Sequence, residues 1–159
     1  MPTILVIDDE PGVRRAIGTI LRMEGFNVSM AEDGRAGLNL ARQLNPDAIV
    51  VDIFMPEMDG LGTIRHVQDI CPGIPIIAVS GHGAPQKRDC SPDFLSMAIR
   101  LGATRALYKP FSADELVSTI HAAMRETAAS PPVKRIAQDC PDEESIGEDE
   151  PALRPAIKS

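Results

Sequence analysis

The sequence predicts an α/β fold, a doubly wound and mainly parallel five-stranded sheet with five helices on its two faces. Five short apolar segments of strand length alternate with five segments whose apolar residues recur at helical spacing. Turn-forming Gly, Pro and Asn residues separate them. This alternation favours parallel strands joined by right-handed helical crossovers, because the chain must cross back before each new parallel strand.

The first strand and helix are expected at the N-terminus. Residues 3–7 are continuously apolar and rich in β-branched side chains, which is typical of a strand buried on both faces. An acidic segment, residues 8–10, follows it. Pro11 then stands at a first helical position, and Gly25 is expected to end the helix. The apolar residues that recur at helical spacing along it are Val13, Ala16, Ile17, Ile20 and Leu21.

The second unit and the central strand come next. Residues 26–31 form the second predicted strand, and Asp33 is a suitable cap for the helix after it. Asn45-Pro46 ends that helix, and a third apolar strand, residues 47–51, leads directly to Asp52. The predicted inward face of the second helix is Gly37, Leu40, Ala41 and Leu44.

A loop containing Met55-Pro56 precedes the third helix, which begins near Gly60 and closes at residues 71–73. The fourth strand, residues 74–79, delivers Ser80 at its C-terminal end. A hydroxyl therefore follows this strand where acids follow the first and third. The first turns of the third helix are expected to carry Leu61, Ile64, Val67 and Gln68.

A long loop, residues 81–91, leads into a fourth helix that is expected to end at Gly102. The fifth strand, residues 104–108, is followed by Lys109, and a capping box at residues 112–115 opens the last helix. The predicted apolar residues of these two helices are Leu95, Ala98, Ile99 and Leu101, and Leu116, Ile120, Ala123 and Met124.

Composition bounds the organisation and the partners. We expect one domain over residues 1–127 and an acidic, Pro-rich, disordered tail over residues 128–159. A net charge of −7, one Tyr and no Trp argue against a nucleic-acid partner. The sequence has no basic leader, no apolar run near the roughly 20 residues of a membrane span, and no closely spaced cysteines. We therefore expect no membrane insertion and a cytoplasmic location.

Five polar side chains follow the predicted strands. Asp8 and Asp9 follow the first, Asp52 the third, Ser80 the fourth and Lys109 the fifth. In a parallel sheet these ends share one rim, and clustered carboxylates repel one another unless a cation lies among them. An all-oxygen set favours Mg²⁺. An aspartate beside Mg²⁺, a lysine and a hydroxyl is equipped to attack phosphorus, so the set predicts an aspartyl-phosphate site.

Five dispersed motifs in this order closely resemble the receiver domain of two-component response regulators. The resemblance covers residues 3–127 and implies the CheY-like, flavodoxin-like fold with strand order 2-1-3-4-5. The motifs are Asp8-Asp9-Glu10, Val51-Asp52 with Met55-Pro56, Met58-Asp59-Gly60, Ser80-Gly81, and Lys109-Pro110-Phe111.

The resemblance implies a role for each matching residue. Asp52 matches the phosphoacceptor, Asp9 a direct Mg²⁺ ligand, Asp8 an acid that holds the ion partly through water, and the backbone carbonyl of Phe54 a further ligand. Lys109 matches the lysine that pairs with the phosphate.

Two further positions match the switch of this family. The Ser80 hydroxyl would move toward the phosphate and the Tyr108 ring would turn inward, changing the face made by the fourth helix, the fifth strand and the fifth helix. Pro110 matches a proline that follows the lysine in a cis bond.

The sequence departs from the family pattern at two places. Lys109 lies 29 positions after Ser80, several more than usual, and the added length falls in the 81–91 loop or the start of the fourth helix. Phe54 and His82 stand where residues tune hydrolysis of the phosphoryl group, and a bulky Phe54 that screens the attacking water predicts slow dephosphorylation.

We therefore expect a stand-alone response regulator, not an enzyme with a separate substrate, that promotes its own aspartyl phosphorylation and dephosphorylation. Its expected partners are a sensor histidine kinase or histidine phosphotransfer protein and a downstream protein, and it would be a monomer or a phosphorylation-dependent dimer. The alternatives are a phosphorelay intermediate or phosphate sink, and an interaction module that acts without phosphorylation. A metabolite phosphatase ranks last, because it would need an acid at Phe54.

Overall fold

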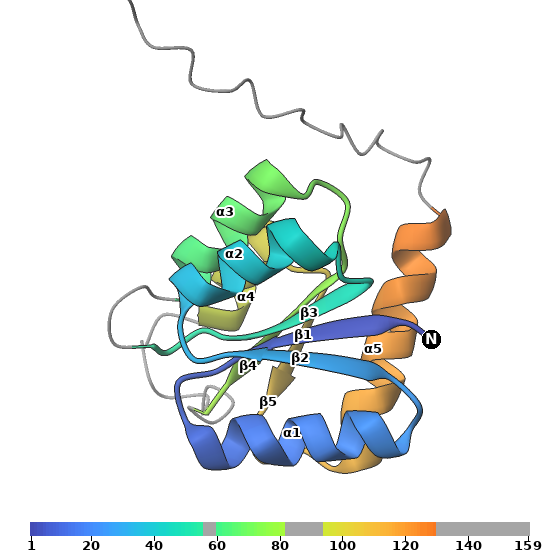
Figure 1. Ribbon diagram of the computed structural model, residues 1–159. Coiled ribbons are helices and arrows are strands. Elements are labelled where there is room, and N and C mark those ends of the chain that lie inside the picture. The colour runs from blue at the N-terminus through green and yellow to red at the C-terminus, as the bar shows by residue number, and fades with distance from the viewer. Residues whose placement is uncertain (56–59, 82–93, 130–159) are drawn as a thin grey trace, which may run out of the picture.

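The computed structural model describes residues 1–55, 60–81 and 94–129. Its sheet is parallel throughout, with strand order β2-β1-β3-β4-β5, so the predicted fold class and strand order are confirmed (Figure 1). The strands are β1 (Thr3–Ile7), β2 (Asn27–Ala31), β3 (Ala48–Asp52), β4 (Ile76–Ser80) and β5 (Arg105–Tyr108).

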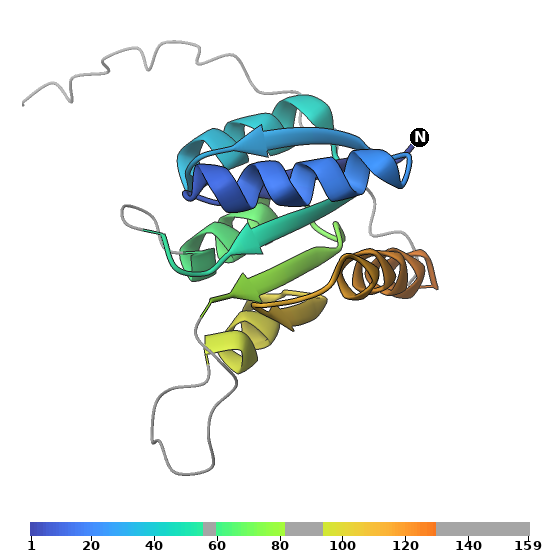
Figure 2. The same cartoon turned by 90° about the horizontal axis from the view of Figure 1, so that it is seen from below.

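Helices cover both faces of the sheet. Helices α2, α3 and α4 lie on one face, and α1 and α5 lie on the other (Figure 1, Figure 2). The five helices are α1 (Pro11–Met23), α2 (Gly34–Leu44), α3 (Gly60–Ile70), α4 (Phe94–Leu101) and α5 (Ala113–Ala129). Helix α5 runs two residues past the predicted domain boundary at residue 127.

Local signals set the helix ends. The Asp33 side chain accepts a 2.7 Å hydrogen bond from the Ala36 amide at the start of α2. At the start of α5 the predicted capping box is formed, because Ser112 and Glu115 each accept a hydrogen bond from the backbone N–H of the other. Asn45, in the left-handed conformation at φ 45°, ends α2 as the sequence predicts.

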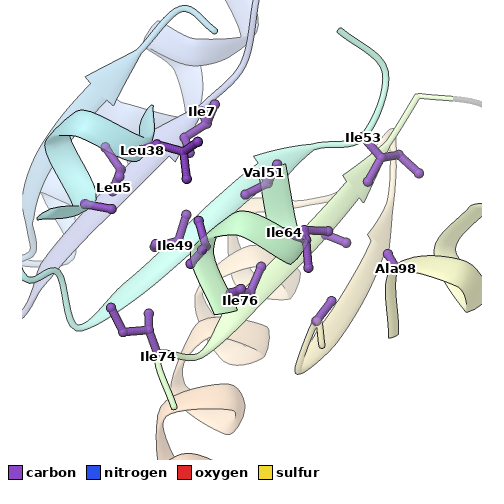
Figure 3. Close-up of a cluster of buried hydrophobic side chains, with 14 of the residues drawn as sticks. Leu5, Ile7, Leu38, Ile49, Val51, Ile53, Ile64, Ile74, Ile76 and Ala98 are labelled. Carbon is purple, nitrogen blue, oxygen red and sulfur yellow. The ribbon is translucent and has the colours of Figure 1, made fainter. Parts of the chain in front are cut away.

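The core has two layers, one on each face of the sheet. Alternate strand residues enter opposite layers because successive side chains of a strand point to opposite faces. Figure 3 shows part of the layer under α2, α3 and α4. Strand residues of that layer include Leu5, Ile7, Ile49, Val51, Ile76 and Ala78. Strand residues of the layer under α1 and α5 include Ile4, Val6, Val50, Ile77 and Val79.

The predicted β4 begins two residues too early. Ile74 is buried, but the ladder begins at Ile76 because Pro75 lacks the N–H that a central strand donates. The Pro75 carbonyl still accepts a 2.9 Å hydrogen bond from the Ile49 amide. At the other end β4 includes Ser80, just as β3 includes Asp52, one residue beyond each prediction.

Four apolar residues of the predicted helices are exposed, namely Ala16, Leu44, Ile99 and Leu101, and of these Leu44 was predicted to face inward. In α2 the buried stripe is centred on Gly37, Leu38 and Ala41, which leaves Leu44 at the stripe's margin and at the last residue of the helix. Only Leu95 and Ala98 are buried in α4, and Ile99 and Leu101 lie on either flank of that pair. Helical spacing identifies a stripe, whereas its centre depends on how the helix sits on the sheet.

Within the described residues no helix is both long and apolar enough to cross a membrane. The predicted tail from residue 130 onward and the 81–91 loop after Gly81, which contains His82, lie outside those residues.

Candidate functional site

The C-terminal ends of β1 and β3 bring three carboxylates together. Asp8 directly follows β1, Asp9 comes next, and Asp52 is the last residue of β3. Oxygens of these three side chains lie within 4.8 Å of one another. Asp8 is 2% exposed and Asp52 is 7% exposed, whereas Asp9 is more accessible. We call this group, Asp8, Asp9 and Asp52, the acidic cluster.

Lys109 supplies the positive charge of the site. It follows β5, its peptide bond to Pro110 is cis, and its backbone N–H donates a 2.8 Å hydrogen bond to the Ser80 carbonyl. Its ammonium group reaches back across the sheet. The Nζ atom donates to Asp8 Oδ2 at 3.2 Å and to Asp52 Oδ2 at 3.5 Å, so one lysine joins the ends of β1 and β3.

Backbone amides fix the other oxygen of the same two aspartates. The Glu10 amide donates to Asp8 Oδ1 at 2.9 Å, and the Phe54 amide donates to Asp52 Oδ1 at 3.0 Å. In each case the donor lies two residues after the acid. This is the arrangement of an Asx-turn, which aspartate readily forms. Each buried carboxylate therefore has Oδ1 held by the backbone and Oδ2 directed to Lys109.

The electrostatics of the site follow from burial and charge. Burial raises the pKa of Asp52, and neither the Phe54 amide nor Lys109 fully offsets it, while nearby Asp8 adds to the increase. Burial alone would lower the pKa of Lys109, but attraction to Asp52 and Asp8 outweighs burial, so its pKa is raised and it remains charged. Without a further cation, the ionised form of Asp52 is therefore destabilised in the folded protein. A positively charged ligand would remove this penalty, so its binding is favoured.

The donor set fits a hard divalent cation. Three carboxylates offer oxygen atoms within a span that one ion can bridge, and Mg²⁺ takes oxygen ligands with waters completing its coordination. A cation among them would relieve both the repulsion between Asp8 and Asp52 and the cost of burying Asp52. The acidic cluster can therefore hold Mg²⁺.

The two predicted switch residues lie on the neighbouring strands at the same rim. Ser80 and Tyr108 end β4 and β5 and are register partners. Ser80 is 3% exposed, and the Tyr108 ring packs, partly buried, against the layer under α2, α3 and α4. Phe54 packs on that layer too, with its amide directed to Asp52. The ligand role of its carbonyl stays a prediction.

Two residues that shape the site were not among the predicted site residues, although Gly60 belongs to one of the motifs. A Cβ on Gly60 would lie 2.2 Å from the Asp52 carbonyl oxygen, so only glycine fits where α3 begins. The sequence signal for such a close approach is a glycine at the end of the loop that follows Asp52. Arg14 donates from α1 to the Asp8 carbonyl at 2.7 Å, and no sequence pattern indicates that contact.

Comparison with known sequences identifies a family. The model of the response regulator receiver domain matches residues 4–121. The probable transcriptional regulatory protein TcrX of Mycobacterium tuberculosis is 31% identical over 80% of this chain and 52% of its own length. Response regulator MprA of Mycolicibacterium vanbaalenii is 34% identical over 78% of this chain and 51% of its own. The chain thus spans about half the length of the curated relatives it matches.

Solved structures agree with the sequence comparison. A response regulator receiver domain protein from Clostridium thermocellum superposes with a TM-score of 0.72 at 29% identity, covering 80% of this chain and 98% of its own. The chemotaxis protein CheY4 of Vibrio cholerae superposes with a TM-score of 0.68 at 28% identity, covering 77% of this chain and 98% of its own. The chain therefore belongs to the response regulator receiver domain family of two-component signalling proteins.

Proposed function

We propose that Asp52 accepts a phosphoryl group from a phosphohistidine on a sensor histidine kinase or histidine phosphotransfer protein. Family membership supports a phosphoacceptor role for the domain. The observation that carries the assignment to Asp52 is its placement at the end of the central strand, with Oδ1 held by the Phe54 amide and Oδ2 facing Lys109. The other two acids of the cluster, Asp8 and Asp9, lie after the end of β1, whereas Asp52 is itself the last residue of β3.

The proposed reaction is an in-line displacement. A carboxylate oxygen of Asp52 forms a bond to phosphorus as the bond from phosphorus to the histidine nitrogen of the donor breaks, with the electron pair leaving on that nitrogen. Lys109, already paired with Asp52 Oδ2, is placed to neutralise charge on the transferred phosphoryl oxygens. Mg²⁺, held by Asp8, Asp9, Asp52 and the Phe54 carbonyl, would supply further positive charge for those oxygens.

Phosphorylation is proposed to act through the two residues next to the site. Ser80 would donate its hydroxyl hydrogen to the phosphate and Tyr108 would turn inward, which changes the face formed by α4, β5 and α5. A downstream protein, or a second copy of the chain in a phosphorylation-dependent dimer, would read this change in the cytoplasm. We further propose that Phe54 screens the attacking water, so that the phosphorylated state lasts long enough to be read.

The test is incubation with acetyl phosphate and Mg²⁺, followed by intact-mass measurement. One phosphoryl adduct is expected on the wild type and none on Asp52→Asn. The matched control is Asp47→Asn, since Asp47 lies just before the same strand at the opposite edge, where its carboxylate accepts from the Thr3 amide at 2.7 Å. It should be phosphorylated like the wild type.

Other results would redirect the assignment. An adduct that persists in Asp52→Asn would place the phosphoacceptor elsewhere. If the wild type formed no adduct while another receiver domain was labelled in the same buffer, an interaction module that acts without phosphorylation would be the better description. Rapid return of the group to a histidine donor in a competition assay would favour a phosphorelay intermediate or phosphate sink.

A further inference from the structure

An aromatic pair joins the site to helix α4. The rings of Phe54 and Phe94 lie with centroids 5.0 Å apart and planes at 78°, an edge-to-face arrangement. Phe54 comes two residues after Asp52, and Phe94 is the first residue of α4. Edge-to-face pairs at this separation are attractive beyond the apolar area they bury, because a positive ring edge meets a negative ring face.

The backbone of Phe54 belongs directly to the site. Its amide donates the 3.0 Å hydrogen bond to Asp52 Oδ1, and this bond sets the rotation of the Asp52 carboxylate. The residue before it, Ile53, is anchored on both sides, since its amide donates to Val79 and its carbonyl accepts from Gly60. The Ile53 carbonyl and the Phe54 N–H belong to the same planar peptide group, so the Gly60 hydrogen bond holds this peptide at its carbonyl end. The Phe54 ring is attached to the Cα at the other end of that peptide, and its contact with Phe94 is a second restraint.

Helix α4 also packs against the neighbouring residue. Ile53 is 3% exposed and shares a core cluster with Leu95 and Ala98, the two buried residues of α4 (Figure 3 labels Ile53 and Ala98). The contact between Phe54 and Phe94 therefore extends a packed surface between α4 and the segment after β3. Any displacement of the first turn of α4 must move the Phe54 ring or break this contact.

We propose that Phe94 is a positioning residue for the phosphoacceptor. Through the Phe54 ring it adds to the restraint that the Gly60 hydrogen bond places on the peptide donating to Asp52 Oδ1, and so couples the start of α4 to the carboxylate. Because such coupling is reciprocal, a ligand that reorients Asp52 also shifts α4. The functional consequence of this coupling rests on the proposed phosphoacceptor role of Asp52. The contact between Phe94 and Phe54 can itself be tested without phosphorylation.

The first test measures the Phe54 amide in the metal-free protein. In Phe94→Leu, which keeps apolar bulk but removes the ring, hydrogen exchange of this amide should speed up about 2- to 10-fold, the range that loss of one aromatic pair predicts. The matched control is Phe26→Leu, which removes a ring that lies 5.4 Å from His121 in the layer under α1 and α5. It should leave Phe54 exchange unchanged. Equal acceleration in both variants would overturn the proposal, because it would indicate general loosening.

The second test is a double-mutant cycle on Mg²⁺ binding, followed by titration calorimetry with the metal alone. Phe94→Leu is expected to weaken Mg²⁺ binding about 2- to 10-fold, and to have no further effect when Phe54 is already leucine. Phe94→Tyr, which retains the ring, should restore wild-type affinity. Additive effects of the Phe54 and Phe94 substitutions would refute a role through Phe54.

The positioning role of Phe94 and the phosphoacceptor role of Asp52 would be overturned by different results. A wild type that binds Mg²⁺ and is phosphorylated, with Phe94→Leu identical to it in both tests, would overturn the positioning role alone. A wild type that neither binds Mg²⁺ nor accepts a phosphoryl group would overturn the proposed function, while faster exchange of the Phe54 amide in Phe94→Leu would still support the contact.

Discussion

Replacing Gly60 by alanine would place a methyl group against the C-terminal end of β3, the strand that ends in Asp52. The added Cβ would lie 2.2 Å from the Asp52 carbonyl oxygen and 2.3 Å from Ile53 Cα. Both neighbours are backbone atoms, so no side-chain rotation can relieve the contact. Either the start of α3 moves away, which breaks the 3.1 Å hydrogen bond from the Gly60 amide to Ile53, or the end of β3 is displaced.

The expected cost is large for a single methyl group. Inserting carbon atoms into packed cores typically costs about 1–3 kcal/mol, and a clash between two backbone segments belongs at the upper end, so we expect Gly60→Ala to lower the free energy of unfolding by about 3 kcal/mol. The control is Gly12→Ala on the exposed side of α1, where a Cβ would meet nothing within 4 Å. It should be neutral or stabilise by up to about 1 kcal/mol through helix propensity.

Urea unfolding followed by far-ultraviolet circular dichroism is the suitable assay, because the chain has no Trp and a single Tyr. Both variants and the wild type should be compared in metal-free buffer and then with Mg²⁺. Since Gly60→Ala displaces the backbone that carries Asp52, the gain in stability on adding Mg²⁺ should shrink as well. A loss below about 1 kcal/mol, the lower limit of the range for overpacking, together with an unchanged Mg²⁺ effect, would refute the steric argument.

Three further predictions concern charge, metal and capping. Because burial raises the folded-state pKa of Asp52 above 3.8, the wild type loses stability as the pH rises from 3.8 to that raised pKa, and the full loss is present at every higher pH. Metal-free Asp52→Asn should therefore be more stable than the wild type at pH 7 and lose this advantage as the pH falls toward 3.8 in urea titrations. Mg²⁺ at 100 times its dissociation constant should stabilise the wild type by about 2.7 kcal/mol, and thermal unfolding of Asp9→Asn should show little of that shift. Ser112→Ala should cost about 1 kcal/mol in urea unfolding by removing the α5 cap, whereas Ser118→Ala, on the exposed surface of the same helix, should change stability far less.

The strands and the shared rim could be predicted because their signals are local. Continuous β-branched runs and the acid, hydroxyl or lysine that follows each one are properties of adjacent residues, and a parallel sheet then brings those ends together. Positions that depend on how helices settle on the sheet could not be predicted. The exposure of Leu44 and Ile99, the hydrogen bond from Arg14 to Asp8, and the meeting of Phe54 with Phe94 each depend on contacts between separate elements.

The two backbone-held aspartates have a thermodynamic consequence for ligand affinity. Asp8 and Asp52 each have one oxygen fixed by the amide two residues ahead, so their side chains lost rotational freedom when the chain folded. Immobilising a side chain on binding ordinarily costs roughly 0.5–1.5 kcal/mol. A cation arriving at this rim meets carboxylates that are already ordered, so its affinity should be governed by exchange of water and protons, with little entropy lost by the protein.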